Sequence, residues 1–173
     1  MRKLLLLLLV AAGFSAAAQK AEPLKDNPNA PYLKQKTLPA FDVLYLNGKD
    51  TFHTKDIPVG KPSVIVYFSP DCDHCKKVIS AMLAQMDKMK DVNVYFMTFM
   101  PVIALEIFNR GYHLERYPSV KLIGQDFKMF FPEFYGVSSV PNVVLYNKNK
   151  KFVKLWKNDV TMEEIVAELK RAK

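Results

Sequence analysis

Residues 63–75 have the sequence SVIVYFSPDCDHC, an unbroken apolar run followed by two cysteines that two residues separate. The run Ser63–Phe68 is rich in β-branched and aromatic residues and does not alternate with polar ones, so it predicts a strand that is covered on both faces. After Cys72 the apolar residues recur with a helical period, which predicts a helix to about Met89. The expected buried face of this helix consists of Val78, Ile79, Met82, Leu83, Met86 and Met89.

Downstream of this helix, Val94–Phe99 predicts a second strand. Strand, helix and strand in that order predict parallel pairing with a right-handed crossover. Pro101 is suited to the first turn of another helix, which we expect to end at Gly111. Val120–Ile123 is a third short strand candidate.

Both flanks of this unit carry hairpin signals. Asn47-Gly48 is a strong turn signal between two short apolar stretches, and it predicts an N-terminal β-hairpin. Val143–Tyr146 and Phe152–Trp156 flank a polar turn and predict an antiparallel pair. Thr161, with Glu164 three residues later, predicts a capped final helix. The expected fold class is therefore α/β, a mixed central sheet flanked by helices.

The N-terminus has the layout of a cleavable secretory signal. Arg2 and Lys3 precede an apolar run, and small residues end at Ala18. The run is well short of the ~20 residues that a membrane-spanning helix needs. We therefore expect a signal peptide over 1–18, an extended proline-containing arm over 19–37, a single domain over 38–173, and a periplasmic or otherwise exported protein.

The charge of the chain does not indicate nucleic acid binding. The formal charge of +8 falls to +6 without Arg2 and Lys3. Apart from a short run at 148–151, the remaining lysines and arginines are scattered along predicted helices and turns, which is typical of a solvated surface. We expect a monomer that binds no nucleic acid.

The two cysteines, Cys72 and Cys75, are the only ones in the chain. An exported protein meets an oxidising compartment, where a closely spaced pair of thiols is expected to have a role. Cys72 is expected at a helix N-terminus, where free amides and the helix dipole favour an anion. Because only a thiolate attacks a disulfide, Cys72 is the expected nucleophile. Cys75, one helical turn later, could then resolve the mixed disulfide.

The two residues between the cysteines are expected to have opposite effects on the thiolate of Cys72. A protonated His74 beside Cys72 would stabilise its thiolate and move the pair toward an oxidant. The carboxylate of Asp73 would raise the pKa of the Cys72 thiol and so disfavour its thiolate. The sequence therefore leaves the direction of electron flow open.

A passive disulfide, a zinc site and a haem attachment site each fit the cysteine pair less well. A structural disulfide would close a four-residue loop worth only about 2 kcal/mol. A zinc site would need four ligands, and His74 with the distant His53 and His113 makes no recognised spacing. Covalent haem attachment would need a histidine directly after Cys75, where Lys76 stands. We therefore expect no cofactor and no metal.

These motifs together resemble the thioredoxin superfamily and, more narrowly, the TlpA-like envelope redoxins, over roughly Leu38 to Leu169. The resemblance implies a thioredoxin-like fold and a thiol–disulfide oxidoreductase. It also implies that Pro141 is cis, faces the two sulfurs, and follows a residue, Val140, that contributes to the substrate groove. It rests on Pro39-Ala40-Phe41, Asn47-Gly48, Gly60-Lys61-Pro62, the strand with Cys72-Asp73-His74-Cys75, Tyr135-Gly136-Val137 and Val140-Pro141.

The chain departs from this family where many relatives carry a buried acid that accepts the proton of the second cysteine. Val66 and Val78 occupy the candidate positions. Water, Asp71, Asp73 or another side chain must then accept that proton.

The expected partners are protein thiols or disulfides, together with a membrane electron donor or acceptor. Two more classes stay open: a thiol peroxidase of the peroxiredoxin type, for which Ser69-Pro70 is a poor motif match, and a non-enzymatic copper-binding redoxin.

Several aromatic residues are expected in the core, with a substrate groove as the alternative. They are Tyr32, Tyr112, Tyr117, Phe130, Phe131 and Phe134.

Overall fold

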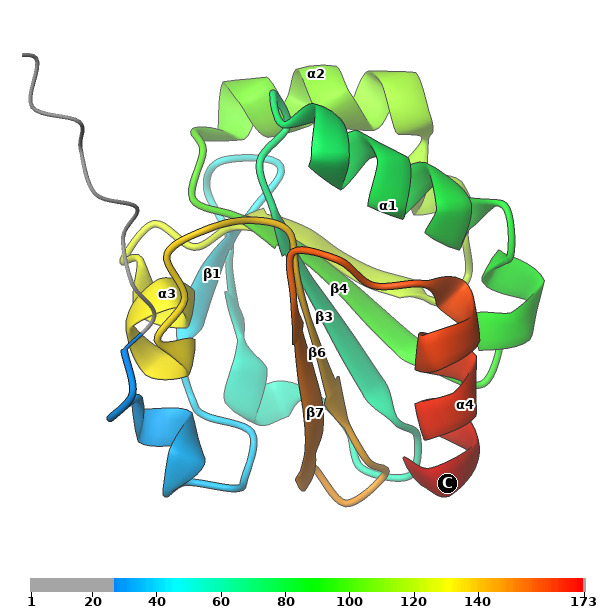
Figure 1. Cartoon of the computed structure of the whole chain (residues 1–173). Coiled ribbons are helices and arrows are strands. Elements are labelled where there is room, and N and C mark those ends of the chain that lie inside the picture. The colour runs from blue at the N-terminus through cyan, green and yellow to red at the C-terminus, as the bar shows by residue number, and fades with distance from the viewer. Residues whose placement is uncertain (1–26, 173) are drawn as a thin grey trace, which may run out of the picture.

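The computed structural model describes residues 27–172, which form a seven-stranded mixed sheet with helices on both faces (Figure 1). The α/β class and the mixed sheet are as predicted. The expected signal peptide and the first part of the arm lie outside the described residues.

The strands are β1 (Asp42–Tyr45), β2 (Thr51–His53), β3 (Ser63–Phe68), β4 (Asn93–Thr98), β5 (Val120–Gln125), β6 (Asn142–Tyr146) and β7 (Phe152–Lys157). The α-helices are α1 (Asp73–Leu83), α2 (Val102–Tyr112), α3 (Phe130–Tyr135) and α4 (Met162–Ala172). Four 3-10 turns are η1 (Pro31–Leu33), η2 (Thr54–Asp56), η3 (Met86–Met89) and η4 (Leu114–Arg116).

The strand order is β2-β1-β5-β4-β3-β6-β7. Strand β4 lies between β3 and β5 and pairs with both in parallel, as the strand–helix–strand pattern predicts. The outer pairs β1–β2, β1–β5, β3–β6 and β6–β7 are antiparallel, which confirms both predicted hairpins. All six residues of β3 are buried, because β3 lies between two neighbours and is covered on both faces.

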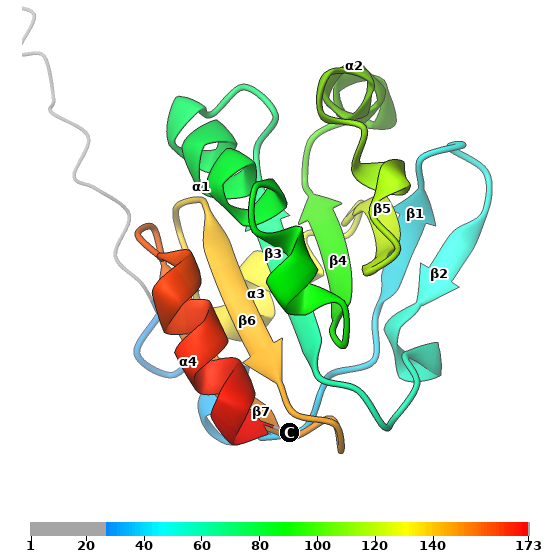
Figure 2. The ribbon, with the colours of Figure 1, turned by 90° about the vertical axis from the view of Figure 1, so that its right-hand side faces the viewer.

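The two faces of the sheet carry separate apolar clusters. On one face, α1, α2 and α4 cover alternate β3 residues that include Val66 and Phe68. On the other face, α3 covers the intervening residues, which include Ile65 and Tyr67. Figure 2 shows α1 and α4 in front of the sheet and α3 behind it. Cys75 belongs to the first cluster, so the second thiol is packed into the core beneath α1.

The helix predicted from Cys72 to Met89 is divided in the structure. Helix α1 ends at Leu83, Gln85 has a φ of −125°, and η3 continues the chain as a 3-10 turn. Met86 and Met89 remain buried. The apolar periodicity identified the buried side correctly but did not reveal the break in helical hydrogen bonding.

Residues 27–37, the described part of the expected arm, pack against the domain. Although we expected an extended arm, its described part contains η1. The ring of Tyr32 packs 5.8 Å from the ring of Tyr135 and 5.4 Å from that of Phe152, measured between centroids. The prolines lack the amide donors that regular secondary structure needs. Burial of the apolar ring of Tyr32 nevertheless favours packing of this segment on the domain.

Candidate active site

The two cysteines lie where β3 turns into α1, at the predicted place. Cys72 is the N-cap residue of α1, with an extended backbone, and its Sγ accepts a hydrogen bond from the amide of Cys75 at 3.1 Å. The sulfur of Cys72 thus takes the place that a serine or aspartate oxygen takes at other helix starts. Both cysteines are free thiols, Cys72 partly exposed and Cys75 buried. A partner sulfur can therefore approach Cys72 but not Cys75.

Cys75 differs from an ordinary thiol in its acidity. Burial, followed by the hydrogen bond with Cys72, raises the pKa of Cys75 to about 12, although the backbone of Ser69 acts in the opposite direction. Val66, at the position where an acid could have accepted the proton, belongs to the same apolar cluster as Cys75. Cys75 therefore keeps its proton at neutral pH until a base removes it.

The two carboxylates near the thiols are engaged by other groups. Asp73 pairs with Lys76 at 2.9 Å, and this hydrogen bond is the main reason that the pKa of Asp73 is lowered. Asp71 accepts a hydrogen bond from the hydroxyl of Ser69. A carboxylate held in an ion pair is a weaker base, so Asp73 is a poor candidate to accept the proton of Cys75.

The side chain of His74 is turned toward the connection between β7 and α4. Its Nε2 lies 3.1 Å from the carbonyl oxygen of Asn158 and 3.0 Å from Oδ1 of Asp159. Because both partners are acceptors, Nε2 carries the proton and is committed to these two oxygens. The carboxylate of Asp159 would also offset a positive charge on the ring.

The loop that contains Val140 and Pro141 lies at the same end of the sheet as the thiols. The Val140–Pro141 peptide bond is cis, which confirms that prediction. Tyr67, near the end of β3, is paired with Asn142, the first residue of β6, so the sheet register brings this loop to the strand end that leads to Cys72. Val140 is partly buried and packs against both apolar clusters.

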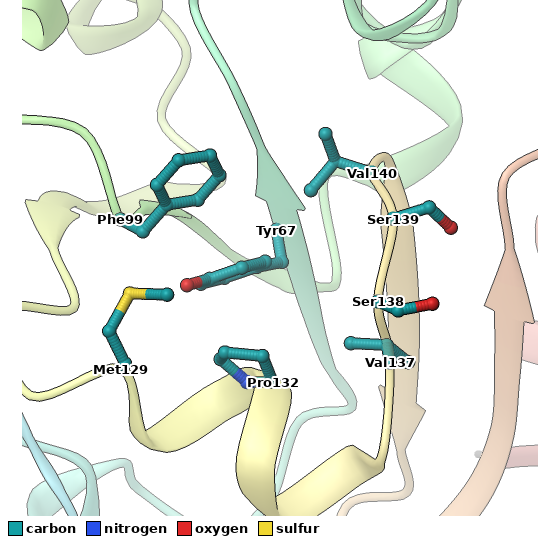
Figure 3. A pocket seen from close by; sticks show the side chains of 8 residues that line it. All are labelled: Tyr67, Phe99, Met129, Pro132, Val137, Ser138, Ser139 and Val140. Carbon is teal, nitrogen blue, oxygen red and sulfur yellow. The ribbon is translucent and has the colours of Figure 1, made fainter. Parts of the chain in front are cut away.

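A cavity of about 360 Å³ opens beside Val140 on the α3 side of the sheet. Its walls are mainly apolar, and the ring of Tyr67 projects between Phe99 and Pro132 (Figure 3). Burial and the nearby carboxylate of Asp126 raise the pKa of Tyr67, so its hydroxyl stays protonated. The lining residues are Tyr67, Phe99, Met129, Pro132, Val137, Ser138, Ser139 and Val140.

The aromatic lining of this cavity differs from the groove aromatics considered from the sequence. Tyr32, Tyr112, Tyr117, Phe130, Phe131 and Phe134 are absent from the lining and pack in or against the two clusters. Tyr67 was missed because β3 has no polar alternation to show which of its residues face a cavity. Asn158, which binds His74, was missed because its contacts are with residues far away in the sequence.

The described residues offer neither a metal cluster nor a membrane-spanning helix. Within residues 27–172, no three His, Cys, Asp or Glu side chains lie together as they would in a metal site. In the same part of the chain, no helix is both long and apolar enough to span a bilayer.

Comparison with known proteins identifies the family to which this fold belongs. The model of the thioredoxin-like domain family matches residues 57–173, a stretch that begins after the β1–β2 hairpin and includes both cysteines and Pro141. No curated protein matches the sequence.

Solved structures share the fold at low sequence identity. A secreted disulfide oxidoreductase from Mycobacterium tuberculosis, described as homologous to DsbE of E. coli, is 20% identical with a TM-score of 0.61 over 76% of this chain and 95% of that one. An exposed lipoprotein thioredoxin from Streptococcus pneumoniae is 20% identical, with a TM-score of 0.59 over 77% and 99%. A peroxiredoxin-like protein from Aquifex aeolicus is 17% identical, with a TM-score of 0.63 over 80% and 86%.

Proposed function

The chain belongs to the thioredoxin-like domain family, and on this premise we propose that it is an exported thiol–disulfide oxidoreductase acting on proteins through Cys72 and Cys75. The observation that carries the proposal is the asymmetry of the two thiols. Cys72 is a partly exposed helix N-cap, whereas Cys75 is buried and has a raised pKa. Disulfide exchange requires one accessible sulfur that forms the mixed disulfide with the partner and a second sulfur that later resolves this mixed disulfide.

In the reducing direction, the thiolate of Cys72 attacks one sulfur of a partner disulfide. A mixed disulfide forms and the other partner sulfur leaves as a thiolate. Cys75 then loses its proton and attacks Cys72, which releases the second partner sulfur and leaves a Cys72–Cys75 disulfide. Two electrons pass from the pair to the partner, and in the oxidising direction the same steps run in reverse.

Val140 and Pro141 are proposed to support the partner beside Cys72. The backbone of the residue before the proline is proposed to bind an extended partner segment, as the family resemblance implies. The apolar cavity next to Val140 could receive a side chain of that segment. His74 remains part of the proposed site. The carboxylate of Asp159 offsets part of the electrostatic effect that a protonated His74 would have on Cys72.

The proposed setting is the periplasm or another exported location. The charged start, apolar run and small residues of 1–18 support it, and we expect processing after Ala18. The proposed partners are protein thiols or disulfides, with a membrane donor or acceptor that restores the redox state of the pair. The proposed working form is a monomer.

The proposal is tested with two single variants assayed against insulin with dithiothreitol as the electron donor. Cys72→Ser should abolish catalysed insulin reduction, because the accessible sulfur is lost. In a separate incubation without dithiothreitol, reduced Cys75→Ala should trap mixed disulfides with insulin, which added dithiothreitol then releases. Catalysis that survives in Cys72→Ser, or a Cys75→Ala protein that traps no partner, would refute the assignment.

Three further measurements separate the remaining alternatives. The reduction potential of the pair assigns the direction of electron flow, since a value of about −270 mV indicates a reductant and one of about −120 mV an oxidant. Rapid peroxide consumption without insulin reduction would favour a thiol peroxidase. Stoichiometric copper binding that depends on both cysteines would favour a metal-binding redoxin.

A further inference from the structure

Asn158, in the connection between β7 and α4, binds two segments that carry the candidate active site. Its backbone amide donates to the carbonyl oxygen of Pro141 at 2.8 Å. Its Oδ1 accepts from the hydroxyl of Ser139 at 2.7 Å. Its carbonyl oxygen accepts from Nε2 of His74 at 3.1 Å. One residue therefore joins the cysteine-bearing helix to the loop that contains Val140 and Pro141.

The backbone of Asn158 makes this arrangement possible. Its φ is +64°, in the left-handed region, where asparagine and glycine are tolerated better than other residues. That conformation turns the chain out of β7 while its amide still reaches Pro141. Figure 1 shows the connection leaving β7 beside the start of β6.

We propose that Asn158 is a positioning residue, which holds the Ser139–Pro141 loop against the start of α1 so that a protein partner meets Cys72 in register. This inference rests on the proposed function. Protein partners need the loop, because they dock along its backbone, whereas a small disulfide needs only the sulfur of Cys72. Loosening Asn158 therefore weakens docking of protein partners and leaves the reactivity of Cys72 toward small disulfides unchanged.

Three substitutions divide the contributions of Asn158. Asn158→Gly keeps the left-handed backbone and both main-chain hydrogen bonds, and loses only the acceptor for Ser139. Asn158→Ala also loses this acceptor, and because alanine disfavours the left-handed backbone, the two main-chain hydrogen bonds weaken as well. Asn158→Asp keeps an acceptor oxygen and tolerates the same backbone. Ser139→Ala removes the same hydrogen bond as Asn158→Gly from its other end.

The experiment measures insulin reduction over a range of insulin concentrations, and separately the reaction of reduced protein with 5,5′-dithiobis(2-nitrobenzoic acid). Asn158→Gly and Ser139→Ala should each raise the KM for insulin about threefold, as expected for one hydrogen bond. Combining the two should add nothing, because they remove the same bond. Asn158→Ala should raise the KM about tenfold or more, and Asn158→Asp should stay near wild type.

A matched control separates positioning from general destabilisation. Gly48, in the β1–β2 turn, also has a left-handed φ of +66°, and a Cβ there would meet only Val102, at 4.0 Å. Gly48→Ala therefore introduces comparable backbone strain outside the candidate site. It should lower the Tm about as much as Asn158→Ala does and leave the KM for insulin unchanged.

The outcomes are distinguishable. An unchanged KM in Asn158→Ala and Asn158→Gly, or a KM that rises equally in Gly48→Ala, overturns the positioning role. A loss of reactivity toward the small disulfide in Asn158→Gly overturns it as well, because the defect would then lie at Cys72. A wild-type protein that reacts with the small disulfide but never reduces insulin contradicts the proposed function itself.

Discussion

Cys72 and Cys75 are one helical turn apart, yet they lie in opposite surroundings. Cys72 takes the N-cap position and remains open to a partner, while Cys75 points into the cluster that α1 forms with the sheet. The difference arises because Cys72 precedes the first turn of α1 with an extended backbone, whereas Cys75 lies within the helix on its buried side. The proposed roles of nucleophile and resolving thiol rest on this difference in depth.

The raised pKa of Cys75 predicts how stability changes in alkali. Below pH 9, the ordinary pKa of a thiol, the folded and unfolded chains both keep the proton of Cys75, and its contribution to stability is complete. Between pH 9 and about 12 only the unfolded chain releases it, so the free energy of unfolding should fall by about 1.4 kcal/mol per pH unit. Denaturation by urea with a reducing agent, from pH 8 to 10.5, measures this slope.

Cys75→Ala is the control for this slope, because it removes the titrating thiol and keeps every other ionisable group. Its free energy of unfolding should fall less steeply above pH 9 than that of the wild type. Parallel curves for the two proteins would show that Cys75 has an ordinary pKa.

His74 offers a second test at the scale of one residue. His74→Ala removes the hydrogen bond to Asn158 and the pairing with Asp159. We expect the KM for insulin to rise roughly threefold, as for one hydrogen bond. We expect the reduction potential to change by less than about 30 mV, a tenfold change in equilibrium, because Asp159 already offsets the charge of the ring. A larger fall in potential would restore His74 as the main regulator of Cys72.

At the scale of the elements, Gly124 allows β1 to pair closely with β5. A Cβ on Gly124 would lie 2.6 Å from the carbonyl oxygen of Leu44 and 2.7 Å from Cγ1 of Val43. Gly124→Ala should therefore push β1 away and lower the free energy of unfolding by about 1–3 kcal/mol, as overpacking does. Urea denaturation monitored by circular dichroism measures the loss.

Gly111 provides the matched control for that substitution. It is exposed in α2, and a Cβ there would meet nothing within 4 Å. Gly111→Ala should stabilise the protein by about 0.5–1 kcal/mol, because alanine loses less entropy in a helix. If both alanines had the same effect, the close approach at Gly124 would not control the packing of β1.

Elements that depend on local pattern were predictable from the sequence. The apolar run of β3 and the hydrogen bonds between Thr161 and Glu164 at the start of α4 are as expected. The end of α2 is less local: the predicted stop was Gly111, but the helix continues to Tyr112 and His113 takes the left-handed conformation. There, the side chain of Asn109 accepts from the amide of Leu114, an interaction that periodicity does not encode.

The candidate site was predictable only where its residues are neighbours in the sequence. The cysteines and their helix follow from a contiguous motif, and the cis bond before Pro141 followed from family resemblance. The contact of His74 with Asn158 joins residues 84 positions apart, and it exists only because β6 and β7 bring their loops to the end of β3. No local pattern marks such a residue.

At the scale of the whole molecule, residues 27–37 cover part of the α3 side of the sheet. The amide of Asn27 donates to the carbonyl oxygen of Gly136, and the amide of Phe152 donates to that of Lys36. Ala30 is fully buried, at a point where Gly136 lacks the Cβ that would lie 2.5 Å away. The segment thus contributes to the core that α3 forms, although its sequence has the composition of a linker.

This packing predicts the effect of shortening the chain. A protein that begins at Leu38 should lose about 2–4 kcal/mol of unfolding free energy relative to one that begins at Asn27, because Tyr32 and Ala30 leave the core and backbone hydrogen bonds are lost. The reaction of Cys72 with a small disulfide should be unchanged in the folded protein, because the segment packs on α3 and the β6–β7 hairpin rather than on α1. Equal urea midpoints for the two proteins would show that residues 27–37 form a dispensable arm, whereas the expected difference would move the working boundary of the domain to Asn27 or before it.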